Sequence, residues 1–182
     1  NPAFCAGCPH GRSTQVVDGS RALAGIGCHT MAMLIDPMKT NTVSHMGGEG
    51  AMWIGQNPFT DEKHVFANMG DGTYFHSGFL AIRAAVAAKV PITYKLLYNG
   101  FVSMTGGQPL EGELSIPQVI EQLKAEGVGR IALVSDDTNK YKGVKVSATL
   151  HHRTAMEAVQ KELREYAGVS VIIYEQACAT ES

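Results

Sequence analysis

The feature that most constrains the fold of this 182-residue chain is a regular alternation of short apolar runs and helical segments from residue 64 onward. Four runs rich in β-branched or other apolar residues are predicted to be strands: 64–68, 92–98, 130–134 and 169–174. Amphipathic or alanine-rich segments between them are predicted to be helices: 75–89, 116–126 and 153–166. Such alternation predicts an α/β fold, in which a mostly parallel sheet carries helices on both faces.

The first sixty residues are less regular, with short strands predicted at 22–26 and 42–44 and a helix at 49–56. Composition excludes several functions. The net charge of −2 gives no basic patch for nucleic acid, and no apolar run is long enough to span a membrane. The chain starts without a methionine or a charged-then-apolar leader, so we expect a fragment of a longer protein without a signal peptide. Four cysteines are too few for a disulfide framework, and we expect the cytoplasm.

Two polar motifs directly follow neighbouring predicted strands. The run Gly-Asp-Gly-Thr at 70–73 follows the strand at 64–68, and Asn99 follows the strand at 92–98. Ligands of such sheets bind beyond the carboxyl ends of the strands, where glycines let the backbone approach a phosphate. Asp71 and Asn99 would supply the oxygen ligands that Mg²⁺ takes beside a diphosphate. A tight turn capped by Asp71, with an unrelated asparagine nearby, is the alternative interpretation.

The cysteines form a second group of candidate ligands. Cys5 and Cys8 form a Cys-x-x-Cys pair, Cys28 follows 20 residues later, and Cys178 lies near the end of the chain. Two thiolates at this spacing can bind one metal centre, and four suit zinc or an iron–sulfur cluster. The spacing alone does not separate these two. A further interpretation is that the cysteines bind no metal, with two of them as separate core thiols and the Cys-x-x-Cys pair without a ligand.

These motifs together resemble a known enzyme family. Gly-Asp-Gly at 70–72, followed after 26 residues by Asn99, resembles the cofactor motif of thiamine diphosphate enzymes. The strings GDGTYFHSG at 70–78 and MTGGQ at 104–108 resemble the 2-oxoacid:ferredoxin oxidoreductases, especially the indolepyruvate ferredoxin oxidoreductase type with all modules in one large chain. The similarity runs from FCAGCPH at 4–10 to YEQAC at 174–178 and covers essentially the whole chain.

The resemblance implies a set of site residues. Asp71, Asn99 and the main-chain carbonyl of Phe101 would hold Mg²⁺. The other residues that it implies for thiamine diphosphate binding are Gly27, Cys28, His29, Met46, Gly47, Gly70, Gly72, Thr73, Ser103, Met104 and Thr105. The ligands that it implies for a 4Fe–4S cluster are Cys5, Cys8, Cys28 and Cys178. His29 is the candidate catalytic residue.

The resemblance also implies an activity and partners. Residues 1–30 would be a Cys-rich, cluster-binding arm, and residues 31–182 the thiamine diphosphate-binding domain of a larger chain. The enzyme would oxidatively decarboxylate a 2-oxoacid, indolepyruvate or another arylpyruvate, to an acyl-coenzyme A and pass electrons through the cluster to ferredoxin. A pyrimidine-binding domain does not fit in this chain, so we expect it to be inactive alone and to join other domains in an oligomer. The alternatives are a non-catalytic zinc module and a non-redox thiamine-dependent decarboxylase domain.

Overall fold

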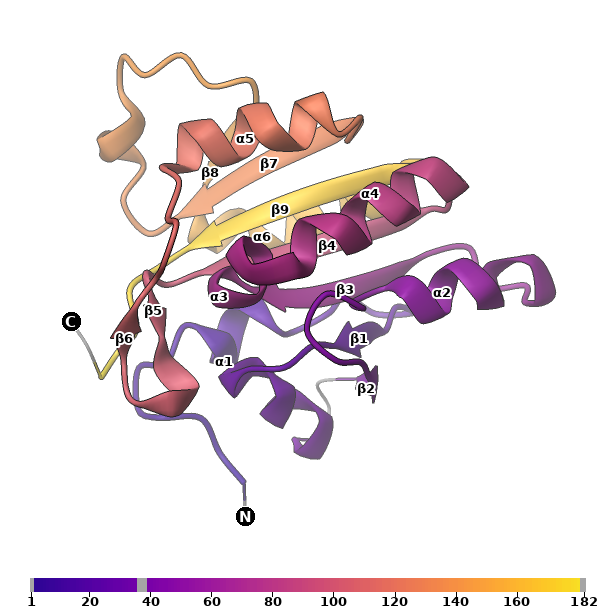
Figure 1. Cartoon of the computed structure of the whole chain (residues 1–182), viewed down its shortest axis with the longest axis horizontal. Coiled ribbons are helices and arrows are strands. Elements are labelled where there is room, and N and C mark those ends of the chain that lie inside the picture. The colour runs from indigo at the N-terminus through magenta and orange to yellow at the C-terminus, as the bar shows by residue number, and fades with distance from the viewer. Residues whose placement is uncertain (1, 36–38, 181–182) are drawn as a thin grey trace.

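The computed structural model describes residues 2–35 and 39–180 and is built on one seven-stranded sheet (Figure 1). The strands lie in the order β2-β1-β3-β4-β9-β7-β8, and all neighbouring pairs are parallel. Their bounds are β1 Ala22–Ala24, β2 Thr40–Val43, β3 Val65–Gly70, β4 Ile92–Tyr98, β7 Arg130–Ser135, β8 Thr149–His152 and β9 Val169–Glu175. The carboxyl ends of these strands therefore share one edge.

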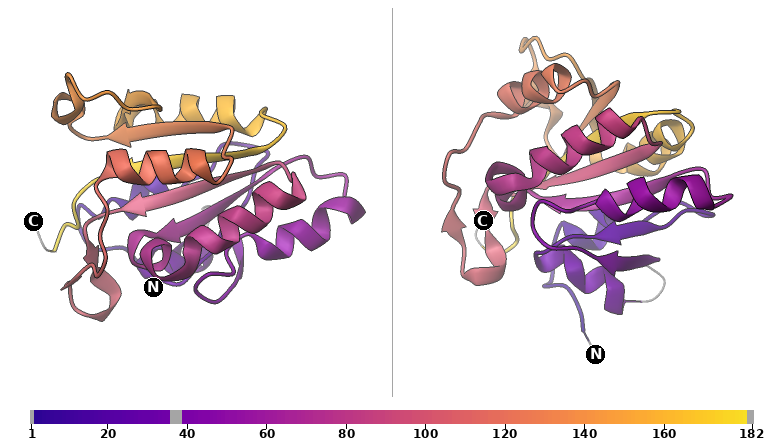
Figure 2. Two further views of the ribbon diagram at one scale, coloured as in Figure 1. Left: turned by 45° about the horizontal axis from the view of Figure 1, so that its top comes forward. Right: turned by 45° about the vertical axis from the view of Figure 1, so that its right-hand side comes forward.

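Helices cover both faces of the sheet (Figure 2). One face packs against α2 (Ala51–Gln56), α4 (Phe79–Ala88) and α5 (Ile116–Ala125), and the other against α6 (Met156–Arg164). The division follows the alternation of side chains along each strand. On β4, Tyr94 and Leu96 belong to the core under α4 and α5, whereas Leu97 belongs to the core under α6.

The predicted α/β class, with its parallel sheet and helices on both faces, is confirmed. The helix predicted at 75–89 is less regular than expected, because it begins as α3 (Asp71–Thr73) and widens into a π-helical turn at Tyr74–Gly78 before α4. A Cβ at Gly78 would collide with Met69 Sδ, so any larger residue would force the buried Met69 of β3 to shift. The helix predicted at 153–166 likewise starts with a 3₁₀ turn.

Two features were absent from the sequence-based prediction. Strand β8 is short and ends in two histidines, so it lacks the apolar alternation of the other strands. The antiparallel hairpin of β5 (Phe101–Val102) and β6 (Gln108–Pro109) follows β4 directly and has only two residues in each strand. The proposed division at residue 30 stays a prediction, and its two parts include residues 1, 36–38 and 181–182, which lie outside the described residues. No helix in the described part of the chain has the length and apolar character needed to cross a membrane.

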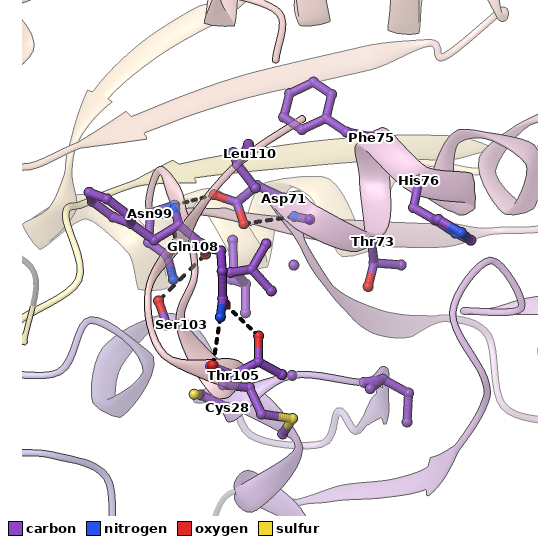
Figure 3. A pocket seen from close by; sticks show the side chains of 18 of the residues that line it. Cys28, Asp71, Thr73, Phe75, His76, Asn99, Ser103, Thr105, Gln108 and Leu110 are labelled. Carbon is purple, nitrogen blue, oxygen red and sulfur yellow. Dashed lines mark hydrogen bonds between the residues drawn. The ribbon is translucent and has the colours of Figure 1, made fainter. Parts of the chain in front are cut away.

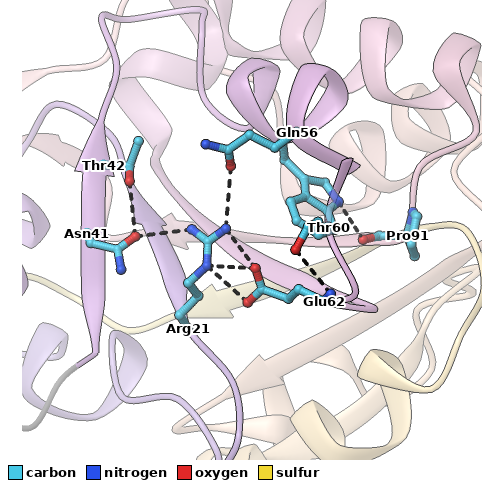
Figure 4. Close-up of polar contacts among 8 residues, drawn as sticks. Arg21, Asn41, Thr42, Gln56, Thr60, Glu62 and Pro91 are labelled. Carbon is cyan, nitrogen blue, oxygen red and sulfur yellow. Dashed lines mark hydrogen bonds and ion pairs between the residues drawn. The ribbon is translucent and has the colours of Figure 1, made fainter. Parts of the chain in front are cut away.

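A polar network fastens the β1–β2 side of the sheet to the α2 region (Figure 4). Arg21, just before β1, donates to both carboxylate oxygens of Glu62 at 3.0 and 2.9 Å and to Asn41 on β2 at 3.1 Å. The buried Trp53 of α2 donates from its indole nitrogen to the carbonyl of Pro91 at 3.0 Å. These bonds link β1, β2 and α2 to the segments that directly precede β3 and β4.

Gly25, at the end of β1, lies where no side chain fits. A Cβ there would be 2.7 Å from the main-chain oxygen of Asn68 and 2.9 Å from Cγ of Glu49. We expect Gly25→Ala to lower the free energy of unfolding by about 1–3 kcal/mol, because the crowded backbone must shift. Gly55→Ala in α2 is the control: nothing lies within 4 Å of its Cβ position, and alanine favours a helix by up to about 1 kcal/mol. Urea denaturation of both variants measures the difference, and equal stabilities would contradict this packing.

Candidate functional site

A pocket of about 670 Å³ opens at the carboxyl edge of β3 and β4 (Figure 3). Three segments supply most of its lining: the loop and 3₁₀ turn after β1, the start of the helix after β3, and the hairpin after β4. His10 and Met46 add to it from other parts of the chain. Of the residues predicted to bind thiamine diphosphate or its metal, all except Gly47 line this pocket: Gly27, Cys28, His29, Met46, Gly70, Asp71, Gly72, Thr73, Asn99, Phe101, Ser103, Met104 and Thr105. The fold thus brings together residues that are up to 78 positions apart in the sequence (27 to 105).

Asp71 joins the ends of the two central strands. Its carboxylate accepts hydrogen bonds from the backbone N–H groups of Gly72, Asn99 and Gly100, each at 2.8 Å. The residue is 3% exposed. Burial raises the pKa of Asp71, and the three backbone bonds oppose that rise. An ionised carboxylate can accept about four hydrogen bonds, so one acceptor position remains for a cation.

The hairpin after β4 forms one wall of the pocket. Asn99 Oδ1 accepts from the backbone N–H of Phe101 at 3.0 Å, which turns the chain into β5. At the tip, Gln108 donates to the carbonyl of Thr105 at 2.8 Å and accepts from its hydroxyl at 2.7 Å. Met104 at this tip is 52% exposed beside the pocket mouth, so it is not a buried core methionine.

His29 is buried at the inner wall of the pocket. Its Nε2 has no hydrogen-bond partner, and its ring meets that of His10 edge-on with centroids 5.8 Å apart. Burial lowers the pKa of His29 to about 3 and that of His10 to about 4, so both rings are neutral at pH 7. A Cβ at Gly27 would come within 2.6 Å of the His29 ring, which explains the glycine at this position.

The four cysteines, all within the described residues, form no disulfide and lie within electrostatic reach of one another. The pKa of Cys8 and that of Cys28 are raised, first by burial and then by the other cysteine side chains, Cys5 and Cys178 included. The Cys-x-x-Cys loop contains a tight turn, in which the N–H of Cys8 donates to the carbonyl of Cys5 at 3.0 Å. Among the described residues, no three cysteine, histidine or acidic side chains are arranged around a common metal position.

Several pocket residues were not among the predicted site residues. They come mainly from the second half of the hairpin and from the helix after β3: His10, Ile26, Phe75, His76, Leu97, Val102, Gln108, Pro109, Leu110 and Glu111. The only sequence signal for the hairpin residues was their position after the MTGG string. Gly47, the predicted residue that does not line the pocket, packs on Ser77 and donates its N–H to Glu49 at 2.9 Å.

The charge of the pocket is unusual for a site that would take an anion. Among the described residues, no lysine or arginine lines it, whereas the acidic side chains of Asp71 and Glu111 do. A phosphorylated ligand would therefore need a metal cation to offset its charge, together with N–H groups at the start of the helix after β3. Asp71 and Asn99 offer the carboxylate and carboxamide oxygens that suit Mg²⁺, so the donor set fits such a cation.

The comparison with protein families decides the identity of the domain. Residues 25–174 match the family described as "Thiamine pyrophosphate enzyme, C-terminal TPP binding domain". This chain belongs to that family. The match begins just before the first pocket loop and ends with β9, so the thiamine pyrophosphate-binding domain includes all the strands from β2 to β9.

Curated relatives of this thiamine pyrophosphate-binding domain are subunits of larger enzymes. The chain is 28% identical to the indolepyruvate oxidoreductase subunit IorA of Thermococcus kodakarensis, over 98% of this chain and 29% of that protein. It is 25% identical to IorA of Methanothermobacter marburgensis, over 97% of this chain and 29% of that protein. The chain thus spans less than a third of the length of these relatives.

Solved structures share the fold at low sequence identity. A 2-oxoglutarate:ferredoxin oxidoreductase from Magnetococcus marinus superposes with a TM-score of 0.72 and 20% identity, over 97% of this chain and 65% of that one. Benzoylformate decarboxylase from Polynucleobacter necessarius gives a TM-score of 0.62 and 18% identity, over 91% of this chain and 32% of that one. The fold is therefore shared by an oxidoreductase and a decarboxylase.

The three bonds of Asp71 predict a specific cost for removing its charge. In Asp71→Asn, an amide N–H₂ replaces one oxygen and faces at least one backbone N–H, so we expect the free energy of unfolding to fall by about 1–3 kcal/mol without added ligand. Asp137→Asn is the matched control. Its Oδ1 accepts from the N–H of Asn139 at 2.9 Å, and asparagine caps a turn as well as aspartate does. Denaturation in urea should separate the two variants, and equal small losses would contradict the clamp at Asp71.

Proposed function

We propose that this chain binds thiamine diphosphate through Mg²⁺ at the Asp71–Asn99 edge and serves a 2-oxoacid:ferredoxin oxidoreductase as its cofactor-binding domain. The observation that carries the proposal is the pair of oxygen ligands at the ends of β3 and β4, in a pocket lined by no lysine or arginine of the described chain. The similarity to IorA subunits supports an oxidative enzyme that acts on a 2-oxoacid such as indolepyruvate.

The position of several pocket residues suggests a role for each of them in cofactor binding. Asp71, Asn99 and the Phe101 carbonyl would hold the metal, and the backbone N–H of Gly72, which lines the pocket, would lie near a phosphate. Met104 and Thr105, at the hairpin tip, would cover the cofactor, with Gln108 fixing the tip through its two bonds to Thr105. When bound, thiamine diphosphate supplies the carbanion that attacks a 2-oxo carbon and the electron sink for decarboxylation.

His29 is the proposed catalytic residue. It is a neutral, buried imidazole with an unpartnered Nε2 at the pocket wall, so a hydrogen bond to a bound group would satisfy a nitrogen that is otherwise costly to bury. A neutral ring can donate or accept a proton at this atom, according to its tautomer. The ring is held in place by His10 and by the close approach of Gly27.

The cysteines support the oxidative branch of the proposal. Cys5, Cys8, Cys28 and Cys178 would hold a 4Fe–4S cluster, which would supply one-electron transfer between the pocket and ferredoxin. Coenzyme A would accept the acyl group. Cys28 lines the pocket itself, so one cysteine of this group lies next to the proposed cofactor. A non-redox thiamine enzyme gives no reason for four thiols that lie near each other.

The metal site predicts an order of effects on cofactor binding. In the full-length protein, Asp71→Ala should weaken Mg²⁺-dependent thiamine diphosphate binding by roughly 100-fold, because the metal loses its anionic protein ligand. Asn99→Ala should cost roughly tenfold, because water can replace a neutral ligand. Asp61→Ala, at an exposed loop outside the pocket, is the control. Calorimetric titrations with and without Mg²⁺ test the order, and wild-type affinity in Asp71→Ala would overturn the site.

The cluster is tested by metal analysis of the anaerobically purified full-length protein. We expect iron and sulfide in the wild type and their loss in Cys5→Ser or Cys8→Ser, because a hydroxyl is a poor substitute for a soft thiolate. Ala6→Ser adds a hydroxyl to the same loop without removing a thiol and should keep the cluster. Zinc in place of iron in the wild type would support the structural zinc module instead.

A further inference from the structure

One strand of the central sheet carries a completely buried lysine that the proposed cofactor site does not use. Lys95 lies in the middle of β4 and has no solvent exposure. Its Nζ lies 4.9 Å from the centre of the Phe66 ring. Burial lowers the pKa of Lys95 well below its usual value. Since burying an amine is costly unless it is hydrogen-bonded, the partners of Lys95 must supply what water cannot.

Those partners belong to the cysteine-bearing arm. Lys95 Nζ donates to the main-chain carbonyl of Gln15 at 2.6 Å and to that of Ser13 at 3.2 Å. Ser13 is the last residue of α1 (His10–Ser13), where carbonyls lack partners within the helix. The bonds therefore join two segments of the chain that are 80 or more residues apart, and they satisfy main-chain groups rather than side chains.

The anchored segment leads directly to the cysteines. The N–H of Gly11, inside α1, donates to the carbonyl of Cys8, and His10 of the same helix contacts His29 at the pocket. Asn99 lies four residues after Lys95 along the same strand direction, about 13 Å away at 3.3 Å per residue. The middle of strand β4 thus contacts the arm through Lys95, and the proposed metal ligand Asn99 follows the end of the same strand.

We propose that Lys95 is a positioning residue that anchors the arm bearing Cys5 and Cys8 to the sheet. Its two hydrogen bonds fix the end of α1, and α1 in turn fixes the Cys-x-x-Cys loop relative to Cys28 and the pocket. The consequence for a cluster rests on the proposed function. The anchoring itself does not, because it depends only on contacts within this chain.

A lysine that merely fills the core would behave differently. Replacing such a buried polar group with an apolar side chain of similar length is often neutral or stabilising, and its effect is not confined to one segment. An anchor, in contrast, gives a local effect: without it, the arm opens more often while the sheet stays closed. Hydrogen exchange resolves such local opening from global unfolding.

The test is hydrogen–deuterium exchange of the full-length protein, read by mass spectrometry on peptides from residues 8–17 and from β9. In Lys95→Met we expect exchange at 8–17 to rise by about tenfold or more, since two hydrogen bonds are lost, while β9 stays protected. Thr93→Val, on the same strand and face, removes bonds to His64 and Ser170 rather than to the arm and should leave residues 8–17 unchanged.

The outcomes separate this proposal from the proposed function. Unchanged exchange at 8–17 in Lys95→Met would overturn the anchoring, as would an equal rise in Thr93→Val or loss of the whole fold in Lys95→Met. Iron content of the same anaerobic preparations should fall in Lys95→Met and not in Thr93→Val. If the wild-type protein holds no iron, the proposed cluster fails, and hydrogen exchange still decides whether Lys95 anchors the arm.

Discussion

The carboxylate of Asp71 is the interaction on which the site depends. By accepting three backbone N–H bonds, it ties the start of the helix after β3 to the turn after β4. It thus adds a side-chain link to the backbone pairing of β3 and β4, directly before the hairpin that begins at Phe101. The same carboxylate lies in a pocket that no lysine or arginine of the described chain lines. One side chain would therefore both link the two strand ends and bind the proposed metal ion.

The two faces of the sheet carry side chains of different kinds. On the face covered by α4 and α5, the strands present apolar side chains that form the largest core. On the opposite face, β4 presents Thr93 and Lys95, which bind polar groups of neighbouring strands and of the N-terminal arm. The arm can therefore dock on one face with its cysteines close to the pocket, while the helices on the other face hold the strands rigid.

The fold was predictable because its signals are local. The strand at Ile92–Tyr98 was predicted with the observed bounds, since its β-branched, aromatic and leucine residues favour a buried strand. The meeting of Asp71 and Asn99 followed from the rule that parallel strands end at one edge. The hairpin, the contact between His10 and His29 and the bonds of Lys95 were not predictable in this way. They depend on how distant segments pack, which neither periodicity nor motif spacing records.

The central claim, that Asp71 and Asn99 hold a metal ion at this edge, is tested most directly by locating the metal. The measurement is anomalous diffraction from crystals of the full-length protein grown anaerobically with thiamine diphosphate and Mn²⁺ in place of Mg²⁺. The account predicts a manganese peak at coordination distance, about 2.2 Å, from carboxylate and carboxamide oxygens of Asp71 and Asn99. A manganese peak elsewhere in the protein, with these two side chains unligated, would contradict it.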